Sequence, residues 1–208
     1  MPLIRKPVDP DRSKGAAHGD VLKLLRSGNQ EERWSAARAA VDVAGATDAL
    51  AAALHTEVDS RVREAMFTSL ARIGSPQSIQ AIVGFLRVDD ASLRTGALDA
   101  LRTLHDAVRE HLPSLMSDAD SDVRVLSCEV ARELPPAEAT RILCELLQRE
   151  QEPNVCAAAI DVLAEVGDRS ALAALAQCEV RFRDTPFLAF AIKVASARIL
   201  EQSTDRHG

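Results

Sequence analysis

The feature that most constrains the fold is an amphipathic helical pattern that returns about every 30 residues. Its most regular copy spans residues 59–74, where an aspartate that can cap a helix comes first and a glycine comes last. Apolar residues recur four, eight and eleven residues after the first position, which traces one stripe of a 3.6-residue period. The first positions, separated by 29, 31, 30, 32 and 32 residues, are Arg33 (an imperfect match), Val62, Leu93, Val123, Val155 and Phe187.

A second stripe, three and seven residues after each first position, holds mostly small side chains. It includes Gly96, although a glycine inside a helix costs about 1 kcal/mol relative to alanine. Small side chains allow the backbones of neighbouring helices to approach closely, so we expect this stripe to lie against an adjacent helix.

Shorter apolar segments lie between the long helices and are predicted to form the other helix of each repeat. Gly45, Gly74 and Gly167 each stand twelve residues after a first position, where we predict the left-handed conformation that ends many helices. The predicted fold is an all-α solenoid, a superhelix of about six helix pairs. The shorter helices are expected at residues 47–55, 76–87, 107–117, 136–149 and 169–178.

These residues resemble the short form of the HEAT repeat, often called the phycobilisome-lyase-type HEAT-like repeat. That repeat has an apolar helix, an Asp-rich turn and a Val-Arg-x-x-Ala start to its second helix. Val62-Arg63, Leu93-Arg94 and Val123-Arg124 match this start, whereas Val155-Cys156 lacks the arginine. Arg33-Trp34 matches poorly, with its register open by one residue. The resemblance covers roughly residues 20–200 and implies a scaffold that serves many functions.

The sequence outside the repeats suggests three segments. Residues 1–18 contain three prolines and no helical period, so we expect a flexible N-terminal arm. Residues 19–201 are expected to form a single HEAT-repeat domain and residues 202–208 a disordered tail. Leu3 and Ile4 are adjacent large aliphatic residues. The arm is therefore either a disordered start, a short docking motif, or a segment that folds back onto the body.

Arginines recur one position after the apolar start of three successive helices, at Arg63, Arg94 and Arg124. We predict that each reaches the aspartates or helix-end carbonyls of a neighbouring turn, which would give a ladder that sets how the repeats stack. The alternative is a basic strip for acidic groups of a partner, reinforced by Arg72, Arg102 and Arg132.

The resemblance also implies where a partner would bind, because the second helices of HEAT-like pairs line the concave side. The groove is expected to change from basic in the middle repeats to acidic in the fifth. The groove candidates are Arg72, Asp99, Arg102, Glu129, Arg132, Asp161 and Glu165, and the candidate hydrophobic anchors are Trp34, Phe182, Phe187, Leu3 and Ile4.

The last repeat departs from the pattern because residues 180–199 contain three of the five phenylalanines. A terminal repeat has no further neighbour, so its outer face should be polar. We expect Phe182, Phe187 and Phe190 to seal the end of the core. The alternative is a hydrophobic socket for a segment of a partner.

Several classes of function are disfavoured by composition and motifs. A net charge of −6 argues against a nucleic-acid binder, and no apolar run is long enough to span a bilayer. The cysteine spacings match no common zinc or iron–sulfur pattern, and they suggest reduced thiols in the cytoplasm. None of the five histidines precedes a glutamate, so the paired His-Glu iron site of some HEAT-type proteins is not expected. No phosphate-binding loop or nucleophile elbow is present.

The predicted function is that of a non-catalytic, monomeric adaptor, scaffold or regulator that binds another protein in its concave groove without a cofactor. One alternative is an accessory factor for an enzyme or cofactor-assembly system, either a lyase-type subunit or a metallocluster helper that uses Cys128 or Cys156. Another is a component of a signalling complex, because short bacterial HEAT proteins are often encoded beside their partners. A phycobilin lyase is disfavoured because the chain has only 3% aromatic residues.

Overall fold

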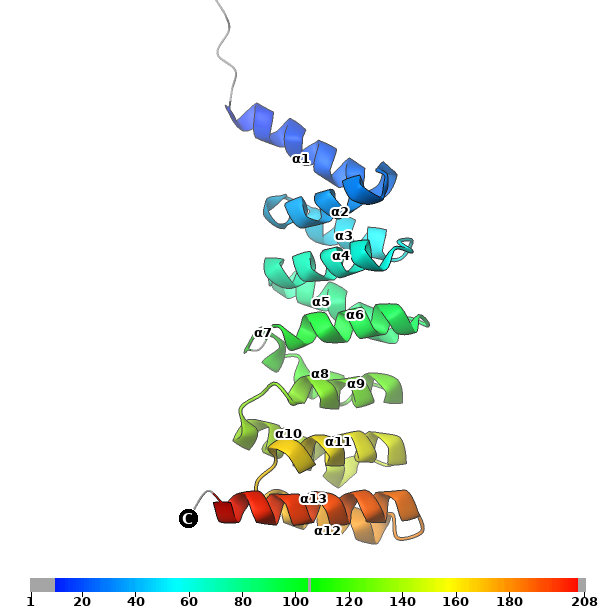
Figure 1. Cartoon of the computed structure of the whole chain (residues 1–208), viewed down its shortest axis with the longest axis vertical. Helices are drawn as coiled ribbons and strands as arrows, with labels where there is room; N and C mark the ends of the chain where they lie inside the picture. The colour runs from blue at the N-terminus through cyan, green and yellow to red at the C-terminus, as the bar shows by residue number, and fades with distance from the viewer. Residues whose placement is uncertain (1–9, 105, 206–208) are drawn as a thin grey trace, which may run out of the picture. The chain divides into compact units, whose positions relative to one another are not determined.

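The computed structural model describes residues 10–104 and 106–205, which form helices and no strands (Figure 1). They divide into two compact units, one ending at Ala100 and the other beginning at Leu101. The first unit contains α1 (Pro10–Ser27), α2 (Gln30–Ala39), η1 (Ala40–Asp42), α3 (Ala46–Leu54), α4 (Ser60–Ile73), α5 (Pro76–Gly84), η2 (Phe85–Arg87) and most of α6 (Ala91–Arg102). The second contains α7 (Asp106–Arg109), α8 (Leu112–Leu115), α9 (Ser121–Ala131), α10 (Pro136–Arg149), α11 (Pro153–Val166), α12 (Ala171–Arg181) and α13 (Pro186–Asp205).

In the first unit the helices pack in two layers. α2 lies against α4 in one layer and α3 lies against α5 in the other, while α1 packs on both α2 and α3. Apolar side chains between the layers exclude water and supply most of the stabilisation. The largest fully buried ones are Leu25, Leu50, Leu54, Met66, Leu70, Ile82 and Leu86.

The second unit repeats this arrangement. α9, α11 and α13 lie side by side in one layer, and α10 and α12 form the other (Figure 1). The largest fully buried side chains here are Leu101, Leu112, Met116, Leu143 and Leu146. Helix pairs that stack on the pairs next to them define an α-solenoid, so the predicted fold class is confirmed.

Several helix bounds agree with the sequence analysis. α10 has the predicted limits, and the predicted helix at residues 76–87 is α5 followed by the 3-10 turn η2. The helix predicted at residues 107–117 is instead two short helices, α7 and α8, because Pro113 enters the first turn of α8. Proline is favoured there, since its missing N–H group would have no partner inside the helix.

The register of the first repeat is one residue earlier than Arg33. Its buried residues Ala36, Ala40 and Val43 stand four, eight and eleven residues after Glu32. The one-residue ambiguity predicted from the sequence is thereby resolved. Arg33 then stands one residue after the first position of its helix, as Arg63, Arg94 and Arg124 do in the later repeats.

The register of the last repeat is one residue later than predicted. Leu188, Ile192, Ala195 and Ile199 are buried, which places the apolar start at Leu188. Phe187 is 50% exposed, so its assignment as the first buried position was wrong. The shift arises because the turn before α13 is one residue longer than the alignment assumed.

The three predicted left-handed glycines have different conformations. Gly74 (φ 58°) ends α4 as predicted, and Gly45 (φ 77°) is left-handed immediately before α3. Gly167 has φ −69°, so the left-handed prediction was wrong there. A side chain is excluded for another reason, because a Cβ on Gly167 would lie 2.4 Å from the carbonyl oxygen of Leu163.

Gly96 supports the interpretation of the small-residue stripe. A Cβ on this residue would lie 2.7 Å from two carbon atoms of the Phe67 ring, so a side chain would require the ring to shift. Close packing of α6 against α4 therefore accounts for a glycine inside a helix.

The helices extend beyond both ends of the domain predicted at residues 19–201. α1 begins at Pro10, within the segment expected to be an arm, and α13 reaches Asp205. Leu3 and Ile4 lie outside the described residues.

Truncating a buried residue of the stripe tests the core assignment. Leu101 is fully buried, so Leu101→Ala should lower the free energy of unfolding by about 2–5 kcal/mol through lost burial and a residual cavity. The control Val58→Ala changes a residue that is 85% exposed and should stay within about 0.5 kcal/mol of wild type. Urea unfolding measures both variants, and a loss below about 1 kcal/mol for Leu101→Ala would contradict the assignment.

Candidate protein-binding surface

Two systems of charged side chains connect neighbouring repeats, one within the turns and one on the surface of the second unit. The inner system begins at Arg33, whose Nε and Nη2 donate to the two carboxylate oxygens of Glu57 over 2.6 and 3.0 Å. Glu57 is 5% exposed and also accepts hydrogen bonds from the backbone N–H groups of Val58 and Asp59. The hydrogen bond from Arg33 is the main reason that the pKa of Glu57 is lowered.

The same arrangement recurs in the second unit. Arg124 donates from Nε and Nη2 to Glu150 over 2.7 and 3.0 Å, and its Nη1 donates to the carbonyl oxygen of Asp118 over 2.8 Å. Glu150, which is 6% exposed, accepts from the N–H groups of Gln151 and Glu152. Burial raises the pKa of Glu150, but the hydrogen bonds outweigh this effect and the pKa is lowered.

The intervening arginines make related contacts. Arg63 donates to the carbonyl oxygen of Glu57 over 2.6 Å and lies 3.3 Å from the Asp90 carboxylate. Arg94 donates to the carbonyl oxygen of Val88 over 2.9 Å. The predicted ladder is confirmed, because each arginine is held by its own turn and, for Arg63 and Arg124, by the next one.

Glu57 and Glu150, the acidic partners in this ladder, were not predicted from the sequence. Each stands five residues before the apolar start of the following long helix, Val62 or Val155. An alignment of the turns as well as the helices would have placed the two glutamates in one column. Their near-complete burial could not have been anticipated, because a glutamate in a turn is usually exposed.

The surface system lies on α9, α11 and α13. Arg132, which follows the last residue of α9, contacts three carboxylates: Glu129 at 3.2 Å, Asp161 at 3.1 Å, and Glu165. Burial lowers the pKa of Arg132, but hydrogen bonds to these three groups outweigh it and the pKa is raised. Arg132 is therefore already neutralised within the molecule.

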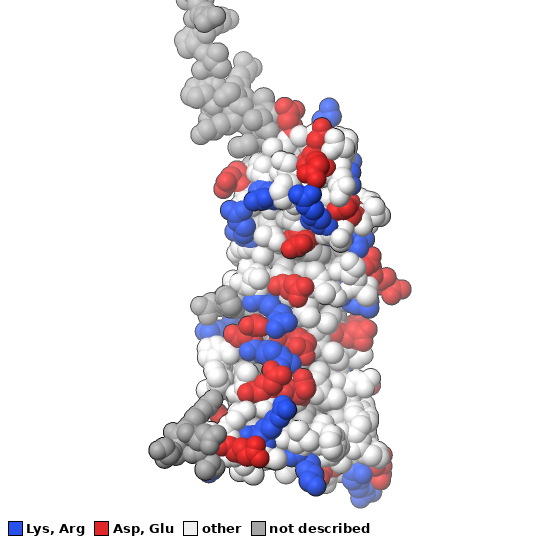
Figure 2. Space-filling model, in the orientation of Figure 1, with Lys and Arg blue, Asp and Glu red and all other residues white. Residues whose placement is uncertain are grey.

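One further ion pair and two charged side chains of α13 extend this surface. Arg102 lies 2.8 Å from Glu133, and Arg198 and Glu201 project from α13. Figure 2 shows acidic and basic side chains alternating over this part of the molecule. The surface carries an excess of two negative charges; its members are Arg102, Arg132, Arg198, Glu129, Glu133, Asp161, Glu165 and Glu201.

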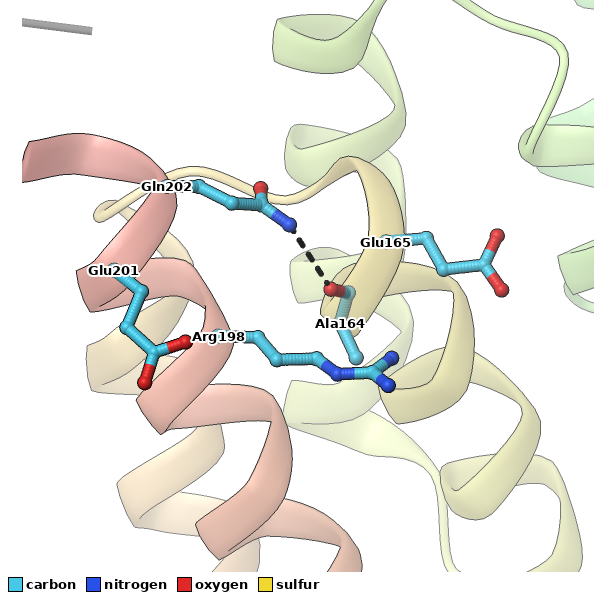
Figure 3. A pocket seen from close by; sticks show the side chains of 5 residues that line it. All are labelled: Ala164, Glu165, Arg198, Glu201 and Gln202. Carbon is cyan, nitrogen blue, oxygen red and sulfur yellow. Dashed lines mark hydrogen bonds between the residues drawn. The ribbon is translucent and has the colours of Figure 1, made fainter. Parts of the chain in front are cut away.

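A hollow of about 320 Å³ lies between α11 and α13 on this surface (Figure 3). Arg198 extends from α13 toward α11, and Gln202 donates to the carbonyl oxygen of Ala164 over 3.5 Å. Glu165 borders the hollow from α11. The hollow presents both charges to solvent, and it suits a polar side chain of a partner better than an apolar one.

A second hollow, of about 420 Å³, is lined by the Arg124–Glu150 pair and the turns around it. Because Arg124 and Arg149 in its lining donate hydrogen bonds to carbonyl groups of the preceding turn, we assign this hollow to the stacking of repeats.

The other predicted site residues lie outside the charged surface of α9, α11 and α13. Arg72 and Asp99 are exposed and belong to the first unit. Trp34 is half-buried, with the guanidinium groups of Arg38 and Arg61 lying 4.6 and 4.2 Å from its ring. Phe182 is half-buried beside Arg181.

The Phe-rich end does not have the expected structure. Phe187 is 50% and Phe190 is 71% exposed, so the prediction that these residues seal the core was wrong. Leu188 and Ile192 fill the core there instead, because the helix is rotated by one residue relative to the predicted register.

Three of the four cysteines lie in the core. Cys128, Cys156 and Cys178 are buried, and burial raises the pKa of Cys128 to about 12. Cys156 takes the ladder position that the earlier repeats give to arginine, and a hydrogen bond with Cys178 raises its pKa. Within the described residues, no group of three or more His, Cys, Asp or Glu side chains is placed to hold a metal ion.

A sequence profile of HEAT repeats matches residues 20–102 and 109–180, which is most of the chain. The protein belongs to the HEAT-repeat family. No curated protein matches the sequence. No helix in the described part of this HEAT-repeat protein has the length and apolar character that crossing a membrane requires.

Solved structures of repeat proteins resemble this HEAT-repeat chain at low identity. Cex1p is 15% identical with a TM-score of 0.54, over 93% of this chain and 45% of Cex1p. An archaeal HEAT-like repeats protein from Thermococcus onnurineus NA1 is 13% identical with a TM-score of 0.49, over 95% and 99% of the two chains. The CpcE–CpcF complex of phycocyanin lyase from Nostoc sp. PCC7120 is 16% identical with a TM-score of 0.38, over 96% and 98%. At this identity the likeness concerns the fold alone.

Neutralising Glu150 tests the inner ladder. Glu150→Gln should lower the free energy of unfolding at pH 7 by about 3–5 kcal/mol, because Arg124 would be left without its buried charge partner. The adjacent Glu152 is exposed and accepts no capping hydrogen bond, so Glu152→Gln should change stability by about 0.5 kcal/mol or less.

The effect of Glu150→Gln should also depend on pH. Because the pKa of Glu150 is lowered in the folded protein, its contribution is present above the unfolded value of about 4.3 and is lost as pH falls through the folded pKa. Urea unfolding between pH 7 and pH 3 should therefore show the wild-type and variant stabilities converging in acid. A constant difference over that range would contradict the role assigned to the carboxylate.

Proposed function

We propose that the protein is a non-catalytic adaptor, scaffold or regulator that binds a partner protein through the surface of α9, α11 and α13. The observation that carries this proposal is the row of charged side chains presented by three successive second helices. In HEAT-like repeats the second helices line the concave side, so these side chains belong to the expected binding groove. Repeating helices hold them at fixed spacing, which reduces the ordering cost of binding.

The charges on this surface indicate the chemistry of the partner. The groove was predicted to change from basic in the middle repeats to acidic in the fifth. Arg102 and Arg132 do not make its middle part basic, because each is paired with a carboxylate of the same molecule. What remains is an acidic excess around the hollow beside Glu165. We infer that the partner presents lysine or arginine side chains, which such a surface attracts and orients.

The predicted alternative, an accessory factor for cofactor assembly, has less support. Cys128 and Cys156 are fully buried, and within the described residues no group of three or more His, Cys, Asp or Glu side chains is placed to hold a metal ion. The absorption spectrum of the purified protein distinguishes the two functions. A bound chromophore or iron centre would contradict the cofactor-free adaptor, and a spectrum of the polypeptide alone would agree with it.

Two isosteric substitutions test the binding surface. Asp161→Asn with Glu165→Gln removes two charges but keeps oxygen atoms that accept from Arg132, so folding should be retained. Affinity capture from native extract identifies the partner with wild type, and titration then measures its Kd. We expect the double variant to bind about tenfold more weakly, with the difference shrinking at high salt.

The control for this experiment is Glu110→Gln with Glu145→Gln, which neutralises two exposed carboxylates outside the proposed surface in the same unit. It should bind like wild type, because Glu145 contributes only an exposed pair with Arg141. Equal affinities of both double variants for the partner would overturn the proposed location.

A further inference from the structure

Two of the core cysteines lie in one helical hairpin of the second unit. α11 and α12 are consecutive helices in contact, joined by a short turn, so they run antiparallel. Cys156 stands ten residues before the end of α11, and Cys178 stands seven residues after the start of α12. Their levels along the hairpin therefore differ by about one helical turn. Both side chains are fully buried, so both face the interior.

The ladder position of Cys156 brings its side chain toward the end of α12. In the preceding repeat Arg124 has this position and binds Glu150, 26 residues later, which is the residue that caps the end of α10. The same interval from Cys156 leads to Phe182, which caps the end of α12. The backbone N–H of Phe182 donates to the carbonyl oxygen of Cys178, one turn earlier. A side chain at position 156 therefore extends toward the last turn of α12, where Cys178 lies.

The two thiol groups are in direct contact. The thiol of Cys156 donates a hydrogen bond to the sulfur of Cys178, and this bond is the main reason that the pKa of Cys178 is lowered. Arg181 lowers the pKa of Cys178 further, through its positive charge and a hydrogen bond to the same sulfur. The hydrogen bond between the thiols raises the pKa of the donor, Cys156.

Arg181 supplies a hydrogen-bond donor that the oxygen atoms around it leave unmatched. Its two terminal nitrogens donate to the backbone carbonyl oxygens of Leu147 and Gln148, the second over 3.1 Å. Its Nε is buried, and among the described residues it has no oxygen acceptor. A thiol accepts hydrogen bonds weakly and a thiolate accepts them strongly, so the guanidinium group stabilises the thiolate of Cys178.

These contacts give the two cysteines different chemical roles. The thiolate is the nucleophile in cysteine oxidation, so the cysteine beside Arg181 is the one that attacks an oxidant. Cys156, in contact with it, is placed to react with the oxidised sulfur and so to resolve it as a disulfide. Because both side chains are buried, only a small oxidant that reaches them when the hairpin opens locally can react.

We propose that Cys156 and Cys178 form an oxidative modification site, at which a hydroperoxide converts the two thiols to a disulfide that joins α11 to α12. With hydrogen peroxide, the Cys178 thiolate attacks one oxygen and the O–O bond breaks. The hydroxide that leaves takes up the proton lost by Cys178, and Cys178 becomes a sulfenic acid. Cys156 then attacks that sulfur, the S–S bond forms and the S–O bond breaks. In total the thiols lose two electrons and two protons, and one peroxide becomes two waters.

The disulfide would restrain the helix that carries part of the proposed partner surface. Asp161 and Glu165 lie on α11, within ten residues of Cys156. The modification itself requires only the hairpin and Arg181, so it does not rest on the proposed function.

Peptide mapping of the full chain after treatment with hydrogen peroxide tests the site. Without reduction, trypsin should release residues 150–169 linked to residues 170–181, which contain Cys156 and Cys178. Cys144→Ser removes the half-buried thiol outside the pair and should give the same linked peptides. In this variant the intact mass should fall by about 2 Da, because two hydrogen atoms are lost, and dithiothreitol should reverse the change.

The stability of the oxidised protein shows whether the link belongs to the native fold. A cross-link between native neighbours restricts the unfolded chain, so the urea midpoint of wild type should be higher after oxidation than after reduction. Cys156→Ala should show no such rise and should give no linked peptides. Circular dichroism checks that this variant is folded, and the mapping of wild type decides the pairing even if it is not.

Three results would overturn the proposal. The first is a Cys156–Cys178 pair that stays reduced while peroxide modifies Cys144. The second is a disulfide with a different pairing. The third is a linkage that lowers the urea midpoint, because it would then form only in unfolded chains. None of these measurements involves a partner protein, so this proposal and the proposed function fail separately.

Discussion

A pair of helices of about 30 residues cannot bury its apolar stripe alone, and this constraint governs the whole structure. Each long helix presents buried residues at four, eight and eleven positions after its first, and the neighbouring pairs supply the surface that covers them. Small residues such as Gly96 let the helices approach closely enough for this burial. Where no described neighbour follows, as at α13, apolar side chains remain in contact with solvent.

The arginine ladder links neighbouring repeats in a more specific way than apolar packing. Arg33 and Arg124 each join a glutamate of the next repeat to a carbonyl group of their own turn. The glutamates in turn accept backbone N–H groups, so one side-chain pair fixes two turns at once. Removing either partner leaves a buried charge, which is why such pairs restrict how repeats can stack. In the fifth repeat Cys156 replaces the arginine, and Arg181 of α12 instead donates hydrogen bonds to the carbonyl oxygens of Leu147 and Gln148 in α10.

Arginines at different positions of the repeat therefore have different roles. Those of the ladder donate hydrogen bonds to the backbone carbonyl groups of turns. Arg102 and Arg132 lie on the surface, but the carboxylates beside them leave an acidic excess. Arginine can therefore hold neighbouring repeats together at the ladder position. At the positions of Arg102 and Arg132 we propose that arginine contributes to the surface that selects the partner, and the neighbouring carboxylates set the net charge of that surface.

The sequence by itself determined the solenoid and its helix pairs, because the 30-residue period and the 3.6-residue stripe depend only on local spacing. It also placed the arginines of the ladder in one column, but it did not identify their partners Glu57 and Glu150. Tertiary structure decided the registers at both ends, where a turn one residue longer or shorter rotates a helix by about 100°. That rotation buried Leu188 and exposed Phe187. Tertiary structure also decided the charge of the candidate surface, since Arg132 meets Asp161 and Glu165 only when α9 packs on α11. Contacts between residues about 30 positions apart are set by how repeats stack, and that geometry is not encoded in any single repeat.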